Sequence, residues 1–402
     1  MLTPYVEVLR RRGALAFSAA GVVGRLPIAM ESLGVVLLVS LTTDSYALAG
    51  VLASALALSA SLISPLTSRW ADRSGQLRVV PFLAISQSLA LIAFVLAVRA
   101  GQPVWLLVLL AALGGALQPN IGSMVRARWS AMLTGTPQLN VAFALESVLD
   151  EMLFVIGPPL AAILATTVSP GAALLVSAVL VVVGGLSLAA QRRTQPPVHW
   201  QPEADHQPLG VTVLIIAVIF ACLGITFGAL DVATVAFANE RGTAWLSGVL
   251  VSLAALGSLI GGLGFGARAA GRDLPRLLLW VSVASTVVAL ALPLLSSPIL
   301  LAVALFLAGV TIAPSLICGY TIIENIVAPV RLTESITWAT AGIGIGVAVA
   351  SSVAGAVIDS ASSSAGYWIC VAGSALATLA CAVTLPALER RWRNRSHTQI
   401  AN

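Results

Sequence analysis

Between two long apolar runs the chain reads SPLTSRWADRSGQLRVVP, residues 64–81. This connector holds three arginines, Arg69, Arg73 and Arg78, and one aspartate, Asp72, although only 9% of the chain is charged. Soluble domains carry about 25% charged residues, whereas 58% of these 402 residues are hydrophobic. Most of the protein surface is therefore expected to face lipid, and the connector is expected to lie in water.

Apolar runs of about 20 residues are long enough for a helix to cross about 30 Å of hydrocarbon. The sequence holds twelve such runs, which are separated by turn or charge signals such as TTDS, VSPG, NERGT and LSSP. We therefore predict an all-α membrane protein with twelve transmembrane helices in two pseudo-symmetric six-helix bundles. The predicted spans are 14–40, 46–67, 78–98, 104–125, 140–166, 170–190, 210–237, 244–266, 275–295, 298–322, 333–357 and 364–386.

The longest polar stretch, residues 191–208, separates the first six spans from the last six. The predicted domains are a bundle of residues 1–190, a cytoplasmic linker of residues 191–208, a bundle of residues 209–388 and a basic cytoplasmic tail of residues 389–402. All 21 basic residues are arginines, and 18 of them fall on one side of the membrane. Because cytoplasmic loops carry an excess of basic residues, both termini are predicted to be cytoplasmic, in a multi-pass protein of the cell inner membrane.

A second connector, GFGARAAGRDLPR at residues 264–276, repeats the first one in degenerate form. Placing Gly75 on Gly271 gives a repeat of 196 residues, or six spans, which favours two parallel halves. The twelve-span plan and the first connector resemble the major facilitator superfamily of secondary transporters. The connector signature of that family, G-x-x-x-D-R-x-G-R-R, is matched by Asp72, Arg73 and Gly75.

The connector also departs from this signature, because Ser68 replaces its first glycine and Arg78 is displaced by one position. The resemblance implies that Asp72, Arg73, Gly75 and Arg78 form a cytoplasmic latch that breaks when the two halves rock. In this latch the aspartate would meet the positive N-terminal end of span 11, and the glycine would allow a tight turn. A plain basic loop is the alternative, and it explains the arginines but not the aspartate and glycine at this spacing.

Span 5 carries three acidic residues. Glu146 and Asp150 are four residues apart and share one helix face, and Glu151 lies about 100° further round the helix. Carboxylates at membrane depth are costly and repel one another, so one of them is a candidate proton carrier. The alternative is a structural pairing with Arg126 and Arg128 at the end of span 4.

The same span continues with Gly157, Pro158 and Pro159. Two prolines remove two backbone donors, which predicts a kink or a flexible point. The sequence resembles the G-P core of the span 5 signature of facilitator antiporters. That resemblance favours export by antiport over import.

Two equivalent spans carry further charges, with Arg25 and Glu31 in span 1 and Asp231 in span 7. The resemblance implies that spans 1 and 7 line a central cavity. We predict that Arg25 and Asp231 approach each other across this cavity as an ion pair. The alternative places the Arg25 head group at an interface by snorkelling, with Asp231 binding a proton or substrate alone.

The sequence as a whole favours a proton-coupled exporter of small amphipathic molecules that works by alternating access, with an importer of a sugar or organic acid as the alternative. No metal-ligand cluster, nucleophile motif or phosphate loop favours an enzyme, so no cofactor and no metal are expected. No arginine cluster is large enough to track nucleic acid. The expected partners are a small-molecule substrate, protons and membrane lipid, and the protein is expected to be a monomer.

Overall fold

The computed structural model describes residues 3–133, 136, 138–196, 210–266, 273–327 and 332–400. Within these residues the chain forms helices and no strand, and twelve helical segments are long and apolar enough to cross a membrane. The helices are α1 (Thr3–Leu9), α2 (Ala14–Thr43), α3 (Tyr46–Ser74), α4 (Gln76–Arg99), α5 (Val104–Ala116), α6 (Ile121–Leu133), α7 (Gln138–Thr167), α8 (Ala172–Ala190), η1 (Arg192–Thr194), α9 (Val211–Asn239), α10 (Leu246–Gly266), α11 (Leu274–Ala289), η2 (Leu292–Leu294), α12 (Pro298–Val310), α13 (Ile312–Ile326), α14 (Leu332–Ser360) and α15 (Ser363–Ile400).

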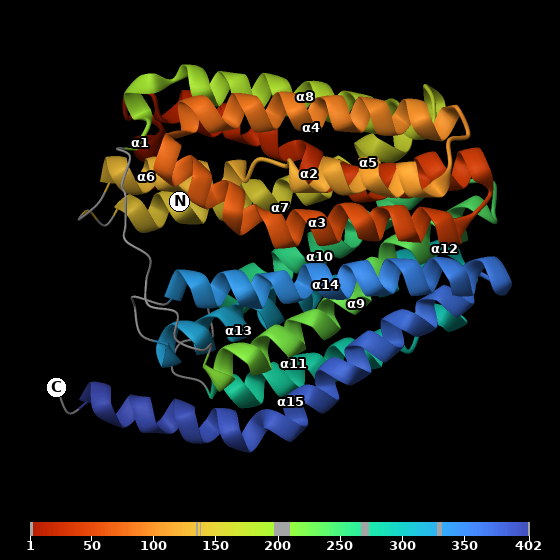
Figure 1. Cartoon of the computed structure of the whole chain (residues 1–402). Coiled ribbons are helices and arrows are strands. Elements are labelled where there is room, and N and C mark those ends of the chain that lie inside the picture. Colours follow the sequence, from red (N-terminus) through yellow and green to blue (C-terminus); the bar gives the residue numbers. More distant parts are fainter. Residues whose placement is uncertain are drawn as a thin grey trace.

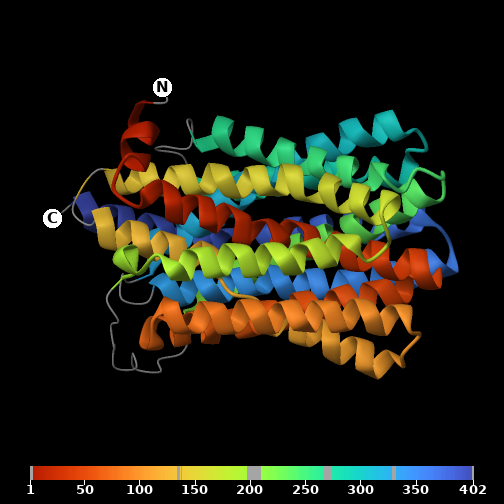
Figure 2. The ribbon, with the colours of Figure 1, turned by 90° about the horizontal axis from the view of Figure 1, so that it is seen from above.

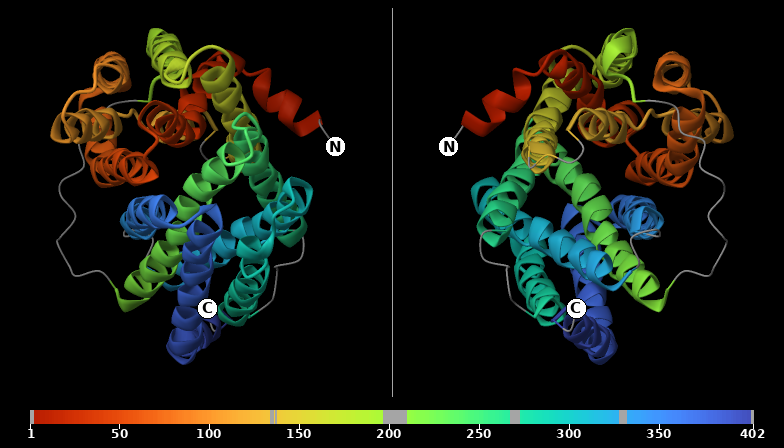
Figure 3. Two further views of the ribbon diagram at one scale, coloured as in Figure 1. Left: turned by 90° about the vertical axis from the view of Figure 1, so that its right-hand side faces the viewer. Right: turned by 90° about the vertical axis from the view of Figure 1, so that its left-hand side faces the viewer.

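The helices gather into two groups along the chain. Figure 1 shows α1–α8 in the upper part of the molecule and α9–α15 in the lower part, and the end-on views of Figure 3 show the same grouping. We call residues 3–196 the N-terminal half and residues 210–400 the C-terminal half. The predicted all-α fold with twelve membrane-length helices is confirmed.

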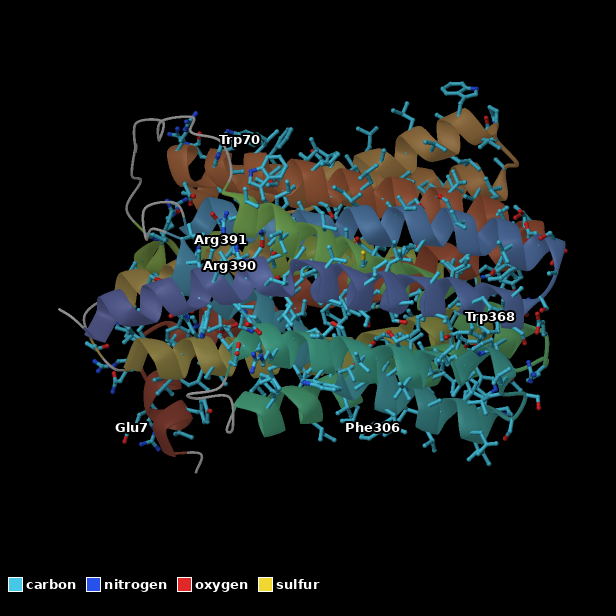
Figure 4. The ribbon with its side chains drawn as sticks, turned by 90° about the horizontal axis from the view of Figure 1, so that it is seen from below. Glu7, Trp70, Phe306, Trp368, Arg390 and Arg391 are labelled. Carbon is cyan, nitrogen blue, oxygen red and sulfur yellow. The ribbon has the colours of Figure 1, made fainter. Side chains whose placement is uncertain are left out.

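Both chain ends lie at the same end of the bundle (Figure 2). This end also carries most of the described arginines, and we call it the arginine-rich end. Figure 4 shows Arg390, Arg391 and Trp70 toward this end and Trp368 toward the opposite, arginine-poor end. The two tryptophans are 42% and 50% exposed, as expected for aromatic residues near the two membrane surfaces.

Two of the predicted spans are broken rather than continuous. Span 4 consists of α5 and α6 with an unwound segment at residues 117–120, and span 10 consists of α12 and α13 separated at Thr311. The breaks fall at equivalent places in the two halves, and Pro119 in the first break is the sequence signal for it. Broken spans of this kind are typical of transporters. They are tolerated where the free backbone groups face protein rather than lipid.

The two halves meet along the antiparallel helices α3 and α14, which lie side by side in Figure 1, and along α7 and α10. Close contact depends on glycine here, because a Cβ at Gly50 would overlap the carbonyl oxygen of Ser351 and a Cβ at Gly248 would overlap that of Pro158. The Ser54 hydroxyl donates to the carbonyl oxygen of Ala348. All of these contacts lie in the arginine-poor half of the spans.

The first connector forms the predicted tight turn. Gly75 ends α3 and precedes α4 with φ +85° and ψ 141°, and its amide donates to the carbonyl oxygen of Ala71 at 2.9 Å. Asp72 and Arg73 are exposed. The predicted partner of Asp72 lies at the start of span 11, where the side chain of Thr333 lies outside the described residues, so the latch stays a prediction. The two prolines of span 5 lie inside an uninterrupted α7, and their role as a flexible point also stays a prediction.

Candidate functional site

The first charged site lies in the arginine-rich half of the spans and joins α2, α6 and α7. Arg25 of α2 forms two ion pairs with α7, from Nη2 to Glu146 Oε2 at 2.5 Å and from Nη1 to Asp150 Oδ1 at 2.7 Å. Arg126 of α6 pairs through Nη2 with Asp150 Oδ2 at 2.6 Å. We call these four residues the arginine cluster. Its two positive and two negative charges balance.

The Arg25–Glu146 side of the arginine cluster is buried and well hydrogen-bonded, whereas the Arg126 and Asp150 side chains are about one third exposed. The side chains of Arg25 and Glu146 are 2% and 0% exposed. Glu146 Oε1 also accepts from Ser18 Oγ at 2.7 Å and from the indole nitrogen of Trp129 at 2.8 Å. Since every group has partners, the cluster cross-links three helices, and removal of one partner would leave a buried charge unpaired.

The predicted pair of Arg25 with Asp231 is wrong. Arg25 is engaged with α7 of its own half, and Asp231 instead accepts a hydrogen bond from Ser32 Oγ at 3.1 Å. Ser32 lies seven residues beyond Arg25 on α2, which is about 10 Å of helix rise. Asp231 is level with this serine, so it is too far along the span to meet Arg25. The snorkelling alternative for Arg25 is also excluded by its burial.

The structural alternative for the span 5 carboxylates is seen for Arg126 but not for Arg128. The guanidinium of Arg128 donates to Gln76 Oε1 at 2.8 Å, to the Gln191 carbonyl oxygen at 3.1 Å and to Thr194 Oγ1 at 2.8 Å. It thereby ties the start of α4, beside the first connector, to the segment that follows α8. Arg128 therefore cross-links helices at the arginine-rich end of the N-terminal half.

The second charged site lies near mid-span and contains no arginine among the described residues. Glu31 of α2 is 1% exposed. Its Oε1 accepts from Gln87 Nε2 of α4 at 3.0 Å, and its Oε2 accepts from Gln118 Nε2 at 2.9 Å. We call Glu31, Gln87 and Gln118 the carboxamide cluster. Here two neutral amides, rather than cations, hold a buried carboxylate.

The two glutamines are functional candidates that the sequence reasoning missed. Gln118 lies in the unwound segment between α5 and α6, so the break in span 4 is what presents its amide to Glu31. The proline that follows it was the available signal. Gln87 is 0% exposed on α4, and its Oε1 has no hydrogen-bond partner within the described part of the chain. A polar residue in the middle of an apolar span was the signal for this one.

Asp231 is a carboxylate of the C-terminal half that lies at the level of the carboxamide cluster along the spans. It is half-buried on α9, and its partner Ser32 directly follows Glu31 on α2. Thus spans 1 and 7 each carry one mid-span carboxylate, and the hydroxyl of Ser32 bridges the halves between them. Neither carboxylate has an ion-pair partner among the residues that the structure covers.

The third acidic residue of span 5 stands apart from both sites. Glu151 is half-buried and makes no ion pair or hydrogen bond to a described residue. In the described ranges, no group of three His, Cys, Asp or Glu side chains could hold a metal ion.

Two groups of broken and continuous membrane-length helices, with ionisable groups held at mid-span, are the architecture of a secondary transporter. The chain belongs to the Major Facilitator Superfamily, whose sequence profile matches residues 14–296, more than half of the chain. A second profile, described as the uncharacterised MFS-type transporter YbfB, matches residues 237–401. No curated protein shows a significant sequence match. The predicted membership of this superfamily is confirmed.

Solved transporter structures share the fold. A mutant of the nucleoside transporter NupG matches with a TM-score of 0.75 at 13% identity, covering 92% of this chain and 99% of that chain. An auto-inhibited POT family peptide transporter matches with a TM-score of 0.71 at 13% identity, with coverages of 94% and 97%. A bacterial homologue of the iron transporter ferroportin in the inward-facing state matches with a TM-score of 0.69 at 14% identity, with coverages of 92% and 99%. At these identities the likeness shows the fold alone.

Proposed function

We propose that this protein is a proton-coupled exporter of small amphipathic molecules. The protein would lie in the cell inner membrane, with the arginine-rich end and both termini in the cytoplasm. Its two halves would rock about mid-span. The observation that carries the proton coupling is the pair of mid-span carboxylates, Glu31 and Asp231, which have no arginine partner among the described residues. The family supplies small-molecule transport, and these two residues supply the coupling.

The arginine cluster argues against a coupling role for span 5. Glu146 and Asp150 are balanced by Arg25 and Arg126, so a proton added to either carboxylate would leave the cluster with an excess positive charge at membrane depth. A charged side chain at the bilayer centre costs about 2.5–3.5 kcal/mol on insertion scales. Protonation of a carboxylate in the carboxamide cluster instead removes a charge and creates none. Proton exchange is therefore cheaper at Glu31 than at the span 5 carboxylates.

Gln87 suits both protonation states of Glu31. With an ionised carboxylate its Nε2 donates, as the structure shows at 3.0 Å. If the side-chain amide turns over, its Oε1 accepts from the protonated carboxyl group, because a primary amide carries a donor and an acceptor of similar shape. In either orientation one of the two amide atoms, Oε1 or Nε2, has no hydrogen-bond partner within the described part of the chain. The turn therefore leaves the number of satisfied hydrogen bonds unchanged.

Asp231 links the proton to the movement of the halves. Its hydrogen bond from Ser32 crosses the interface between the halves next to Glu31. A substrate that enters between the halves would meet this aspartate, which is half-buried, before Glu31, which is almost fully buried. Exchange of substrate against a proton at Asp231 would then alter the contact between α2 and α9.

The proposal of export rests on the resemblance of the segment around Gly157 and Pro158 to the antiporter signature. A Cβ at Gly157 would collide with Ala29 of α2, and the carbonyl oxygen of Pro158 packs against Gly248 of α10. The segment that resembles the antiporter signature thus lies where α2, α7 and α10 meet. A movement of the halves has to pass through this contact.

The test is flux in proteoliposomes under an imposed pH gradient, using fluorescent amphipathic cations and neutral dyes as probes. Glu31→Gln and Asp231→Asn should each abolish gradient-driven flux while exchange of labelled for unlabelled probe continues. Glu151→Gln, which removes a carboxylate outside both clusters, is the matched control and should keep its flux. Normal gradient-driven flux in Glu31→Gln and in Asp231→Asn would overturn the coupling proposal. Probe movement in the same direction as protons would favour the importer alternative.

A further inference from the structure

The arginine-poor end carries a contact between the halves that resembles a helix cap. Asp359 lies in the last turn of α14, in the C-terminal half. Its carboxylate accepts hydrogen bonds from Ser45 Oγ at 2.9 Å, from the Tyr46 amide at 2.7 Å and from the Ala47 amide at 2.8 Å. These three donors form the beginning of α3, in the N-terminal half. One carboxylate therefore closes the end of a helix that belongs to the other half.

The chemistry of a helix N-terminus explains why a carboxylate binds at the beginning of α3. The first amide groups of a helix have no partner inside the helix, and the helix dipole makes this end positive. Ser45 is the N-cap residue of α3 and accepts from the Leu48 amide at 3.1 Å. Asp359 takes two further amides that this serine leaves free, and it adds a full negative charge at the positive end.

The neighbouring contacts hold the same residue, Tyr46, from a second helix. Asn239, the last residue of α9, donates through Nδ2 to the Tyr46 hydroxyl at 2.9 Å. A Cβ at Gly355 would overlap the Tyr46 carbonyl oxygen, so α14 and α3 touch here without side chains between them. The start of α3 is thus clamped by the ends of α9 and α14.

We propose that Asp359 is a latch that keeps the arginine-poor end of the transporter closed, and that it alternates with Asp72 at the other end of the same helix pair. This inference rests on the rocking movement in the proposed function, but not on the proton sites. Asp359 holds the beginning of α3 in the conformation described here. When the halves rock, this contact opens and the end of α3 that carries Asp72 approaches the beginning of α14.

The register of the helix pair supports this pairing of the two aspartates. Contacts of α3 with α14 join Tyr46 to Asp359 and to Gly355, and Ser61 to Gly344. In these pairs the two residue numbers add up to between 401 and 405. Extending this antiparallel register to Asp72 reaches the beginning of α14 at Leu332. Each helix of the pair therefore has an aspartate in its last turn, level with the first turn of the other helix.

Rocking about mid-span makes the two contacts exclusive. α3 is 29 residues long, or about 43 Å, so the two aspartates act at opposite ends of one long lever. Separation of the helices at one end accompanies their approach at the other. A latch at each end gives the transporter two held conformations, and the balance between them depends on the two aspartates.

The experiment measures distances between spin labels on both ends of the full-length protein in lipid nanodiscs. One label pair replaces the exposed residues Gln102 and Ser296 at the arginine-poor end, and the other replaces Arg192 and Arg390 at the arginine-rich end. Asp359→Asn should move population toward a longer distance in the first pair and a shorter distance in the second. The expected change in the population ratio is up to about fivefold, as for loss of a charge at a helix end, because the asparagine keeps one acceptor oxygen.

Asp44→Asn is the matched control, because Asp44 is exposed at the same end, one residue before Ser45, and makes no hydrogen bond to a described part of α3. Its φ of 52° suits asparagine, so this control should leave both distance distributions unchanged. Tyr46→Phe removes only the bond from Asn239 and should shift both pairs in the same direction as Asp359→Asn, by less. This second variant keeps the test decisive if Asp359→Asn lowers the folding yield.

Asp72→Asn completes the test, since it should shift both distances in the opposite direction. Unchanged distances in Asp359→Asn and Tyr46→Phe, while Asp72→Asn still shifts them, would overturn the latch and leave rocking intact. Unchanged distances in all variants would overturn the latch together with the rocking movement. Loss of proton-driven flux in Glu31→Gln with intact label shifts in Asp359→Asn would support the latch whatever the coupling site.

Discussion

The arginine cluster and the carboxamide cluster each include one residue of α2, Arg25 and Glu31, which are six residues apart. The two clusters differ in the groups that bind their carboxylates. In the arginine cluster, Glu146 and Asp150 are held by cations and by neutral donors, and the charges cancel. In the carboxamide cluster, Glu31 is held by two neutral amides and has no cation beside it among the described residues.

This difference teaches how one bundle can use acidic residues for two purposes. A carboxylate paired with arginine is locked in its charged form by the cost of leaving the arginine alone, so it serves as a cross-link. A carboxylate paired with amides can gain and lose a proton while its partners stay satisfied. We therefore expect the partner, rather than the depth in the membrane, to decide whether a buried acid is structural or can exchange a proton.

The largest expected effect is at the centre of the arginine cluster. Arg25→Ala leaves Glu146, which is fully buried, without its cation and removes one of the two arginines of Asp150. We expect a loss of about 3–5 kcal/mol, as for a broken buried ion pair. Thermal unfolding in detergent measures it. A double-mutant cycle of Arg25→Ala with Asp231→Ala should give a coupling energy near zero, and a large coupling would restore the pair that the structure excludes.

The sharpest comparison makes the same substitution in both clusters. Glu146→Gln weakens the pairing of Arg25 and should cost about 1.5–3 kcal/mol, the range for a hydrogen bond to a charged group. Glu31→Gln leaves no cation without a partner among the described residues and should change stability by less than about 1 kcal/mol. Unfolding temperatures of the two variants, measured side by side, test the comparison. Equal destabilisation would show that the two clusters do not differ in kind.

A smaller effect is expected on the pH dependence of transport in Gln87→Leu. The Gln87 amide can bond to either form of Glu31, but its hydrogen bond to the ionised carboxylate is the stronger one. Loss of this amide therefore disfavours the ionised form, and the proton stays bound up to higher pH. The pH of half-maximal gradient-driven flux should rise by about one unit, which corresponds to about 1.4 kcal/mol. Charged residues on α2 and on the helices packed against it include Asp231, which accepts from Ser32, and Arg25, which pairs with Glu146.

Gln118→Leu is the matched control for that shift. Its side chain is half-buried in the unwound segment, where water can replace the lost donor, so the pH midpoint should rise by less than in Gln87→Leu. An unchanged or lowered midpoint in Gln87→Leu would contradict the role of the amides. A flux profile measured from pH 5 to pH 9 covers both outcomes.

The smallest effect is expected at the acidic residue that belongs to neither cluster. Glu151→Gln should change stability by less than about 0.5 kcal/mol and leave the pH midpoint in place, because this half-buried side chain makes no ion pair with a described residue. The same unfolding and flux measurements apply. A loss of gradient-driven flux here would return the coupling site to α7.

The breaks in spans 4 and 10 show where the sequence could have been read further. Each of these spans was predicted as one helix because hydropathy averages over about 20 residues and does not register a local unwinding. Pro119 marked the first break, but its consequence, an amide presented to Glu31, depends on the position of α2 relative to α5 and α6. A span boundary is a local property, whereas a hydrogen bond between spans is not.

The sequence by itself determined the twelve spans, the bias of arginine to one end and the turn at Gly75, because hydropathy, charge and backbone freedom act within about 20 residues of chain. Only the tertiary structure decided which charges meet. Arg25 had acidic candidates in spans 5 and 7, and the choice fell to Glu146 and Asp150 through helix packing and depth along α2. Asp359 likewise reaches the start of α3 from more than 300 residues away, which no local pattern encodes.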